Sequence, residues 1–447
     1  MNQSRNHNSA TPAASVGRRT FLGQVAAGGA LAGMALHGGL ARGVEAAEEN
    51  GEERRIVVGV MGLSRGRALA NTFAKLPNVS IKYLCDADTT RADACTADIA
   101  KIEGQKPEAI QDFRRILDDE EVDVLVCAAP NHWHAPATIF ACQAGKHVYV
   151  EKPCSHNPHE GEMMVAAARK HNRAVQMGSQ RRSGAKIVAG INLLKEGAIG
   201  KVYYSRSWYA NSRGPIGKGK PGGVPSDLDF DLWQGPAPNR PYVDNLVHYN
   251  WHWRWHWGNG ELGNNGIHSL DLCRWGLGVE YPIRVVSAGG RYAFDDDQET
   301  ADTHNVSFEF EGGKQIFWEG LSCNRFGINQ SGFGTTFHGE KGSLSLTDGG
   351  YILYDNRNKE VKKENASRGD TEHIVNFLDA IRNEKPLSLN AEIEEGHKST
   401  LLCHLGNIAH RTGRALNCDP QNGHILNDKE AMQLWAREYN PKFEPKV

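Results

Sequence analysis

The first half of this chain takes its architecture from one segment, Arg55-Ile56-Val57-Val58-Gly59-Val60-Met61-Gly62-Leu63-Ser64-Arg65-Gly66-Arg67. Its apolar part, residues 55–61, predicts a fully buried strand, and a helical pattern follows from Arg67 to Leu76. A glycine turn with Gly62 and Gly66 separates the two. A buried strand, a glycine turn and a helix in this order are typical of a parallel sheet with helical connections.

Strand and helix patterns continue to alternate after this segment. Strands are expected at residues 80–85 and 122–128, and helices at residues 90–103 and 136–144. Such alternation predicts a parallel sheet whose strands are joined by right-handed helical crossovers. We therefore expect a doubly wound α/β domain of the dinucleotide-binding, or Rossmann, type over residues 54–175.

The glycine turn departs from the usual Gly-x-Gly-x-x-Gly pattern. Ser64 stands at the second glycine position, between Gly62 and Gly66. That position lets the backbone approach a pyrophosphate, and serine is the smallest replacement, with a hydroxyl that can donate to phosphate. An ordinary strand-to-helix turn is the alternative, and the surrounding strand and helix favour the phosphate site.

The residue that ends the second strand indicates which dinucleotide binds. Asp86 follows the glycine turn by about 20 residues, the usual place of an acidic residue that holds the adenine ribose hydroxyls. Asp86 therefore favours NAD. Arg65 and Arg91 keep NADP open, since a guanidinium can pair with a 2′-phosphate. A plain residue at a strand end is the alternative for Asp86.

A polar segment, Ala129-Pro130-Asn131-His132-Trp133-His134, follows the third strand. Ligands of parallel sheets bind outside the carboxyl ends of the strands, so this loop is expected beside the nicotinamide. Pro130, Asn131 and His134 are the candidate cofactor contacts. A helix N-cap with incidental histidines explains His132 and His134 equally well.

Glu151-Lys152-Pro153 comes directly after a strand-like run, residues 147–150. A lysine ammonium beside a nicotinamide pocket can polarise a hydroxyl and stabilise the alkoxide that forms as hydride departs. A surface Lys-Pro turn is the alternative. The position after a dinucleotide-type half favours a catalytic Lys152, in contact with both cofactor and substrate.

A second group of candidate catalytic residues is Asn264, His268 and Asp271. On a helix they are four and three residues apart, so all three can share one face. A histidine titrates near neutral pH and can accept a hydroxyl proton as hydride leaves. An N-cap asparagine and a core histidine are the alternative. The dinucleotide-type first domain favours the catalytic interpretation over it.

The segment from Tyr249 to Trp257 alternates tryptophans with basic residues. In an extended segment the tryptophans share one face, and flat aromatic faces suit the C–H faces of sugars. We therefore expect a substrate-binding group that consists of Trp253, Arg254, Trp255 and His256. Packing against a sheet is the alternative. The helix-like spacing of its histidines conflicts with the tryptophan period of two, and no metal site is predicted.

From Val202 the pattern changes to short alternating segments joined by turns, which predicts a mostly antiparallel sheet. Strands are expected at residues 202–209, 283–288, 303–310, 314–319, 335–338 and 342–347. Helices are expected near residues 186–196, 264–277, 372–383, 393–412 and 428–439. We predict an α+β domain over residues 176–415 and a C-terminal segment with a helix over 416–447. The last three helices should cover the edge of this sheet or return to the first domain.

The N-terminus predicts export. Gly17-Arg18-Arg19-Thr20-Phe21-Leu22 is a twin-arginine pattern, and a mild apolar stretch and a small-x-small site at residues 44–46 follow it. The stretch is too short and too rich in glycine for a stable membrane anchor. We expect a signal peptide over residues 1–46, recognition by the twin-arginine machinery, and a mature protein in the periplasm or another extracytoplasmic space.

Composition excludes some partners. The chain has 447 residues, a net charge of −2 and a pI of about 6.8, so it offers no basic field for nucleic acid. A mean hydropathy of −0.53 fits a soluble globular protein. Its 9 cysteines include no Cys-x-x-Cys pair, and twin-arginine export carries proteins folded in a reducing compartment, so buried free thiols are expected.

Together these motifs resemble the glucose–fructose oxidoreductase, inositol dehydrogenase and MocA (Gfo/Idh/MocA) family over nearly the whole mature chain. The carriers are the turn around Gly62, Asp86, residues 129–134, the long run 144–153, and the segments 231–238 and 263–271. The resemblance implies a Rossmann domain, a C-terminal α/β domain with a large open sheet for substrate binding and oligomerisation, and NAD or NADP. It also implies that Lys152 and His268 are catalytic, that Glu151 supports the lysine, and that Asp271 lies near the substrate.

One position departs from the family pattern. Family dehydrogenases usually carry an aspartate four residues before the histidine, and this chain has Asn264. Asparagine can bond a sugar hydroxyl but cannot stabilise an imidazolium by charge, so either Asp271 takes that role or the chemistry is altered.

The leading hypothesis is an exported NAD(P)-dependent oxidoreductase of a sugar, polyol or related polyhydroxy compound. Because no free NAD pool is expected outside the cytoplasm, its cofactor should be tightly bound. The family also includes NAD-dependent glycosidases that work by transient oxidation and elimination, which is the second hypothesis. A non-catalytic cofactor-binding protein, which Ser64 and Asn264 leave open, is the third.

Overall fold

The structure is a computed structural model that describes residues 54–348, 350–365 and 369–447. The expected signal peptide, residues 1–46, lies outside the described residues. Within the described part of the chain, no helix is both long and apolar enough to cross a membrane. All nine cysteines are free thiols, and all but Cys323 are buried.

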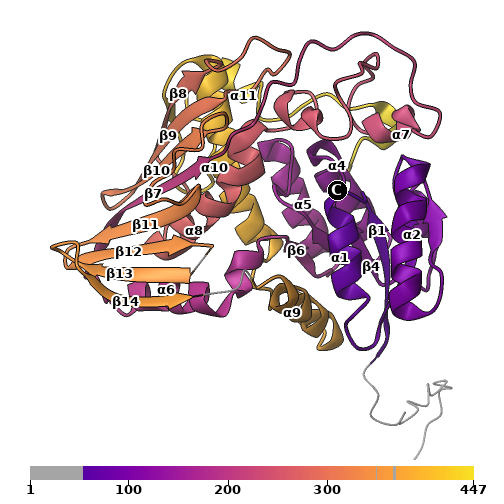
Figure 1. Cartoon of the computed structure of the whole chain (residues 1–447), viewed down its shortest axis with the longest axis horizontal. Helices are drawn as coiled ribbons and strands as arrows, with labels where there is room; N and C mark the ends of the chain where they lie inside the picture. Colours follow the sequence, from indigo (N-terminus) through magenta and orange to yellow (C-terminus); the bar gives the residue numbers. More distant parts are fainter. Residues whose placement is uncertain (1–53, 349, 366–368) are drawn as a thin grey trace, which may run out of the picture. The chain divides into compact units, whose positions relative to one another are not determined.

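The first domain is the expected parallel sheet flanked by helices (Figure 1). Its six strands run in the order β3-β2-β1-β4-β5-β6, so the strand order reverses next to β1. The strands are β1 (Ile56–Met61), β2 (Val79–Cys85), β3 (Glu108–Ile110), β4 (Val124–Cys127), β5 (His147–Val150) and β6 (Val175–Met177). The helices that connect them are α1 (Arg65–Phe73), α2 (Thr89–Glu103), α3 (Arg114–Asp118), α4 (Asn131–Gln143) and α5 (Pro158–Lys170).

Both faces of this sheet are buried, which explains its continuous apolar runs. Leu125 and Cys127 of β4 pack in one apolar cluster with α4 and α5. Val124 and Val126 of the same strand pack in another with α1, α2 and a helix from far along the chain, α9 (Asp370–Arg382). Helix α9 therefore returns to the first domain, one of the two places expected for it.

The second domain is built on a nine-stranded, mostly antiparallel sheet in the order β14-β13-β12-β11-β7-β10-β9-β8-β15, as expected (Figure 1). The pair β7 and β10 is parallel, and the other pairs are antiparallel. The strands are β7 (Val202–Ala210), β8 (Arg284–Gly290), β9 (Thr303–Phe310), β10 (Lys314–Leu321), β11 (Phe333–Gly339), β12 (Gly342–Thr347), β13 (Gly350–Asp355), β14 (Glu360–Asn365) and β15 (Leu416–Asn417). The remaining helical elements are α6 (Ala185–Lys195), α7 (Phe230–Gln234), α8 (Ile267–Leu277), α10 (Ile393–Thr412), α11 (Lys429–Met432), three 3₁₀ turns, η1 (Gln180–Ser183), η2 (Asn250–Trp253) and η4 (Pro441–Phe443), and one π-helical turn, η3 (Leu262–Gly266).

Helices α6, α8 and α10 cover one face of this sheet. Helix α8 and helix α10 share an apolar cluster with β8, β9 and β10, and α6 packs on β12 and β13. Helix α10 also contacts α5 and β6 of the first domain. It therefore holds the carboxyl end of the first sheet against α8.

The structure corrects several expected elements. The segment 129–134 is not a free loop, because α4 begins at Asn131. The expected helix at 428–439 is only α11, since the chain turns after Met432 and buries Trp435 and Phe443 in two different apolar clusters. The unpredicted strands β3, β6, β13, β14 and β15 are short or, like the exposed edge strand β14, lack an apolar alternation.

Candidate active site

A cavity of about 550 Å³ lies between the carboxyl ends of the first sheet and the second domain. Most of the expected cofactor and catalytic residues line it. These residues are Gly62, Ser64, Arg65, Asp86, Arg91, Pro130, Asn131, His134, Glu151, Lys152, Asn264 and His268. The fold therefore brings residues more than 200 positions apart in the sequence to one cavity.

The glycine turn fits a pyrophosphate. Gly62 has φ of +84°, and a Cβ there would lie 2.4 Å from the backbone nitrogen of Ala129, so only glycine is tolerated. At Gly66 a Cβ would lie 3.1 Å from Val60, which shows how closely α1 packs on β1. Ser64 precedes the first residue of α1, and its side chain caps no backbone N–H. The N-terminal N–H groups of α1 and the Ser64 hydroxyl are thus suited to bind phosphate oxygens.

Asp86 follows the last residue of β2 and lines the same cavity. Its Oδ2 accepts from the backbone N–H of Leu63 at 2.7 Å, and its Oδ1 accepts from that of Asp88 at 3.1 Å. Arg91 lies 3.6 Å from Oδ2. Burial raises the pKa of Asp86, while these N–H donors and Arg91 oppose the shift. Asp86 therefore also holds the glycine turn, a task that its position in the sequence does not reveal.

The two histidines at the start of α4 are held by carbonyl groups. His134 lines the cavity, with Nδ1 2.6 Å from the oxygen of Pro153 and Nε2 2.7 Å from that of Ala129. His132 is fully buried, and its Nε2 lies 2.8 Å from the oxygen of Trp233. Burial lowers the pKa of His132 to about 3. Both histidines fix the chain around Lys152 and α7.

Lys152 reaches across the cavity to the second domain. Its Nζ donates to the backbone oxygen of Asn264 at 2.6 Å and lies 3.3 Å from the Asn264 Oδ1. Asn264 sits in the π-helical turn η3, where i→i+5 bonding shifts the carbonyl groups from their α-helical partners. Burial lowers the pKa of Lys152 from its ordinary value. The ammonium is therefore held in a fixed place by the element that precedes His268.

Glu151 is a buried carboxylate with three donors around it. Arg65 Nε and Gln180 Nε2 each lie 3.1 Å from Oε1, and the backbone N–H of Lys152 lies 3.3 Å from Oε2. Arg65 also bonds Asp370 at 2.9 Å. Glu151 thus joins the turn after β1 to the turn after β5 and fixes the backbone that carries Lys152.

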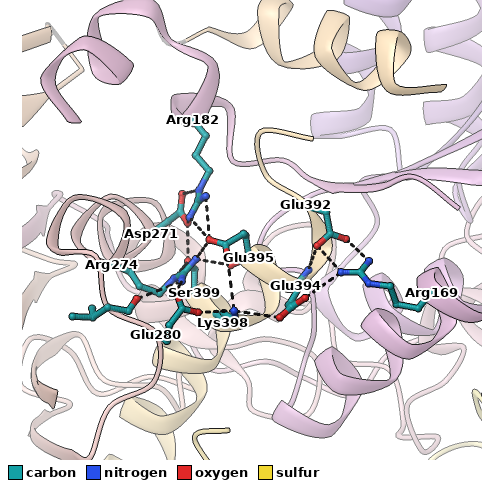
Figure 2. A network of polar contacts seen from close by, with 11 residues as sticks. Arg169, Arg182, Asp271, Arg274, Glu280, Glu392, Glu394, Glu395, Lys398 and Ser399 are labelled. Atoms are coloured by element: carbon teal, nitrogen blue, oxygen red, sulfur yellow. Dashed lines mark hydrogen bonds and ion pairs between the residues drawn. The ribbon is translucent and has the colours of Figure 1, made fainter. Parts of the chain in front are cut away.

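Asp271, the third residue of the helical motif, lies outside the cavity wall. It is 1% exposed, and Arg182 binds it with Nε and Nη2 at 2.8–3.0 Å (Figure 2). Ser399 donates to it at 2.7 Å. Burial alone would raise the pKa of Asp271, but the Arg182 ion pair brings it below the usual range. The arginine network draws Asp271 into the interface between α8, η1 and α10.

The segment around Trp253–His256 is not extended, and the expected shared face of tryptophans is wrong. Trp253 is 2% exposed under the guanidinium of Arg213, and Arg254 bonds Asp297 at 3.1 Å. None of the four expected substrate contacts lines the first cavity. The 3₁₀ turn η2 instead places two neighbouring residues, Trp251 and His252, in its wall.

Several wall residues were not among the predicted site residues. They are Gln180, Arg181, Tyr209, His248, Tyr249, Trp251, His252, Asn265, Phe333 and Asp348. Arg181 Nη2 lies 2.7 Å from Asp348, and its guanidinium lies 4.2 Å from the centre of the Phe333 ring. Arg181 follows the short strand β6, so only the sheet order could have placed it here. Among the described residues no group of three or more His, Cys, Asp or Glu side chains is arranged to hold a metal ion.

Comparison with known proteins identifies the family. Residues 54–179 match the oxidoreductase family profile of the NAD-binding Rossmann fold, and residues 207–444 match that of the C-terminal alpha/beta domain. The chain therefore belongs to the Gfo/Idh/MocA oxidoreductase family. Its first domain is an NAD-binding Rossmann domain.

Individual relatives are distant. A glycosyl hydrolase family 109 protein of Shewanella putrefaciens is 26% identical over 157 residues, which are 34% of this chain and 34% of the relative. The chain thus matches about a third of the length of the curated relatives. An aldose-aldose oxidoreductase of Caulobacter crescentus, solved with glycerol, has a TM-score of 0.62 and 21% identity over 81% of this chain and 100% of its own. The WlbA dehydrogenase of Bordetella pertussis, solved with NADH and UDP-GlcNAcA, has a TM-score of 0.61 and 20% identity over 82% of this chain and 99% of its own.

Proposed function

We propose that this protein transfers hydride between a nicotinamide dinucleotide and a sugar, polyol or related polyhydroxy compound. The observation that carries the proposal is that Lys152 and His268 line the same cavity as the glycine turn around Gly62. The aldose-aldose oxidoreductase among the structural relatives supports a carbohydrate substrate. A bound nicotinamide ring supplies the hydride acceptor or donor.

The residues of the chain divide the remaining work between them. The start of α1 and Ser64 bind the pyrophosphate, Asp86 and Arg91 lie where the adenine ribose is held, and Pro130 and Asn131 border the nicotinamide side. This arrangement leaves both NAD and NADP open, because a carboxylate and a guanidinium stand side by side at the ribose position.

Lys152 and His268 act on the reacting hydroxyl. The Lys152 ammonium donates to the hydroxyl oxygen and stabilises the negative charge that develops there. His268 accepts the hydroxyl proton. Asn264 holds the ammonium between the two domains, and its amide can bond a neighbouring hydroxyl of the substrate. Because Asn264 is uncharged, it cannot stabilise an imidazolium as an aspartate would.

The test uses purified protein and its cofactor. Addition of some sugar or polyol from a panel should change the absorbance of the reduced nicotinamide. Tight binding further predicts that the cofactor stays with the protein through gel filtration. A panel that leaves the absorbance unchanged, with dinucleotide bound, would instead favour a non-catalytic cofactor-binding protein.

Glycoside cleavage by transient oxidation, elimination, hydration and reduction is the second candidate. The family 109 glycosyl hydrolase among the curated relatives favours it, and it would use the same Lys152 and His268. It predicts release of product from an aryl glycoside together with deuterium exchange at the oxidised carbon. Release without exchange, or without NAD, would reject that mechanism.

Export and assembly are proposals that complete this function. We infer that the twin-arginine signal exports the folded protein with its cofactor, and that the open nine-stranded sheet forms homo-oligomers. Replacement of both Arg18 and Arg19 by lysine should keep the protein in the cytoplasm, as measured by fractionation. Light scattering of the mature protein should give a mass of at least two chains. A monomer would contradict assembly through the sheet.

A further inference from the structure

A second cavity, of about 380 Å³, lies apart from the candidate active site, and no residue lines both. It is lined by the start of α5, the loop after α7, the segment before η3, the C-terminal half of α10 and the chain after α11. Trp255 and His256, two of the expected sugar contacts, stand in its wall. The wall also contains His156, Asn157, Arg240, Asn259, His404, Asn407, Arg411, Arg437 and Glu438.

The wall contains buried hydrogen-bond donors that have no partner among the described residues. Asn157 and Asn259 are 6% and 5% exposed, and the Nδ2 of each has no partner with hydrogen-bond geometry among the described residues, although the Asn157 side chain lies beside the hydroxyl of Tyr439. Arg437 uses Nη2 for the oxygen of His132 and for buried Glu160, each at 2.7 Å, and leaves Nε and Nη1 unbonded. Buried donors are costly to leave unbonded, so this set favours an occupant with acceptor oxygens.

One acceptor in the wall also lacks a partner. His156 Nε2 lies 3.1 Å from the carbonyl oxygen of Trp255, so Nε2 carries the proton and donates it. Burial keeps the pKa of His156 well below its usual range, and the ring is neutral. Its buried Nδ1, which has no partner, is therefore an acceptor that requires a hydroxyl or an N–H from the occupant.

The mouth of the cavity is positively charged. Arg240 and Arg411 are exposed and, among the described residues, no carboxylate lies within ion-pair distance of either guanidinium. Each guanidinium lies over a tryptophan ring, Trp257 at 5.9 Å from Arg240 and Trp255 at 5.2 Å from Arg411, and the Glu299 carboxylate acts on Arg411 from beyond ion-pair distance. Glu438 is the one acidic residue in the wall, so the field favours an anion.

We propose that this second cavity binds a small hydroxylated oxyanion, a molecule with a carboxylate or phosphate group and at least one hydroxyl. The anion accepts hydrogen bonds from Asn157, Asn259 and Arg437, and its hydroxyl donates to Nδ1 of His156. Arg240 and Arg411 attract it by charge. The site is distinct from the dinucleotide cavity, and its occupation does not depend on the reaction catalysed there.

The experiment measures binding by isothermal titration calorimetry with three probes: gluconate, glucose 6-phosphate and glucose. At least one of the two anions should bind saturably, and neutral glucose at least about tenfold more weakly. Comparison of the two anions distinguishes a carboxylate from a phosphate source. The double variant Arg240→Gln/Arg411→Gln should bind the anion about tenfold more weakly, because two attractive charges are lost.

A matched control and a site control make the result decisive. Arg325 is exposed, and no carboxylate of the described residues lies within ion-pair distance of it, so Arg325→Gln removes a similar charge elsewhere and should leave binding unchanged. Unaltered melting temperatures confirm that the exposed substitutions keep the fold. The proposal is overturned if neither anion binds, if glucose binds as tightly, or if the double variant binds as well as the wild type. Binding that Lys152→Ala abolishes and the double variant does not would place the probe in the first cavity and likewise overturn it.

Discussion

Removal of the Lys152 ammonium tests the proposed chemistry most directly. Lys152 is half-buried, and its Nζ is held at 2.6 Å and 3.3 Å by the two oxygens of Asn264. It is therefore a preorganised donor, and loss of such a donor lowers the rate by roughly a hundredfold or more. A hundredfold loss corresponds to about 2.7 kcal/mol of transition-state stabilisation. We expect Lys152→Ala to lower kcat by at least this factor.

Cofactor binding should change far less in Lys152→Ala. The proposed pyrophosphate site consists of Gly62, Ser64 and the start of α1, and among the described residues none of these bonds the lysine ammonium. The assay therefore combines steady-state turnover with a titration of dinucleotide binding by fluorescence.

The matched control is Lys385→Ala, which removes an exposed lysine that lies outside the cavity wall. The control should turn over like the wild type. Near-normal kcat of Lys152→Ala with a saturating substrate would refute the catalytic assignment. An equal loss of cofactor affinity would instead make Lys152 a binding residue.

Three further substitutions test other parts of the site. His268→Ala should slow turnover, and the loss should shrink as pH rises because hydroxide can replace the base; a loss that is constant across the pH–rate profile would argue against a base. Gly62→Ala should abolish dinucleotide binding, since its Cβ would lie 2.4 Å from the Ala129 nitrogen, and retained binding by titration would contradict the assigned turn. Asp271→Ala leaves Arg182 buried and should cost about 3–5 kcal/mol in urea unfolding, with little effect on KM. Because the folded pKa of Asp271 is lowered, the stability that its carboxylate contributes is present above the unfolded pKa of about 3.9 and is lost as pH falls through the folded pKa. When the pH is lowered below about pH 4, the melting temperature of Asp271→Ala should therefore fall less than that of the wild type.

The cofactor half of the proposed site could be predicted from the sequence because that half is local. The strand β1, the glycine turn and α1 are consecutive, and only a glycine fits the left-handed conformation at Gly62. Asp86, Asn131 and Lys152 follow strands of a parallel sheet, whose carboxyl ends meet at one edge. Period-two alternation likewise revealed β9, where every second residue is buried against the helices.

Only the tertiary structure decided whether a candidate side chain lines the cavity or is held by another residue in the interior. Asp271 has the helical spacing of a site residue. Its ion-pair partner Arg182, more than 80 positions away in the sequence, holds it in the protein interior instead. Trp253 and Arg254 have the sequence pattern of a sugar-binding surface. In the structure Trp253 is buried under Arg213, and Arg254 forms an ion pair with Asp297.

Contacts between distant segments also formed the parts of the site that the sequence did not reveal. The position of Arg181 depends on β6 lying next to β5, and that of Phe333 on β11 lying next to β7. The second cavity requires five segments that share no motif. Local spacing specifies which residues can share a face, whereas long-range pairing and burial select which of those faces becomes a site.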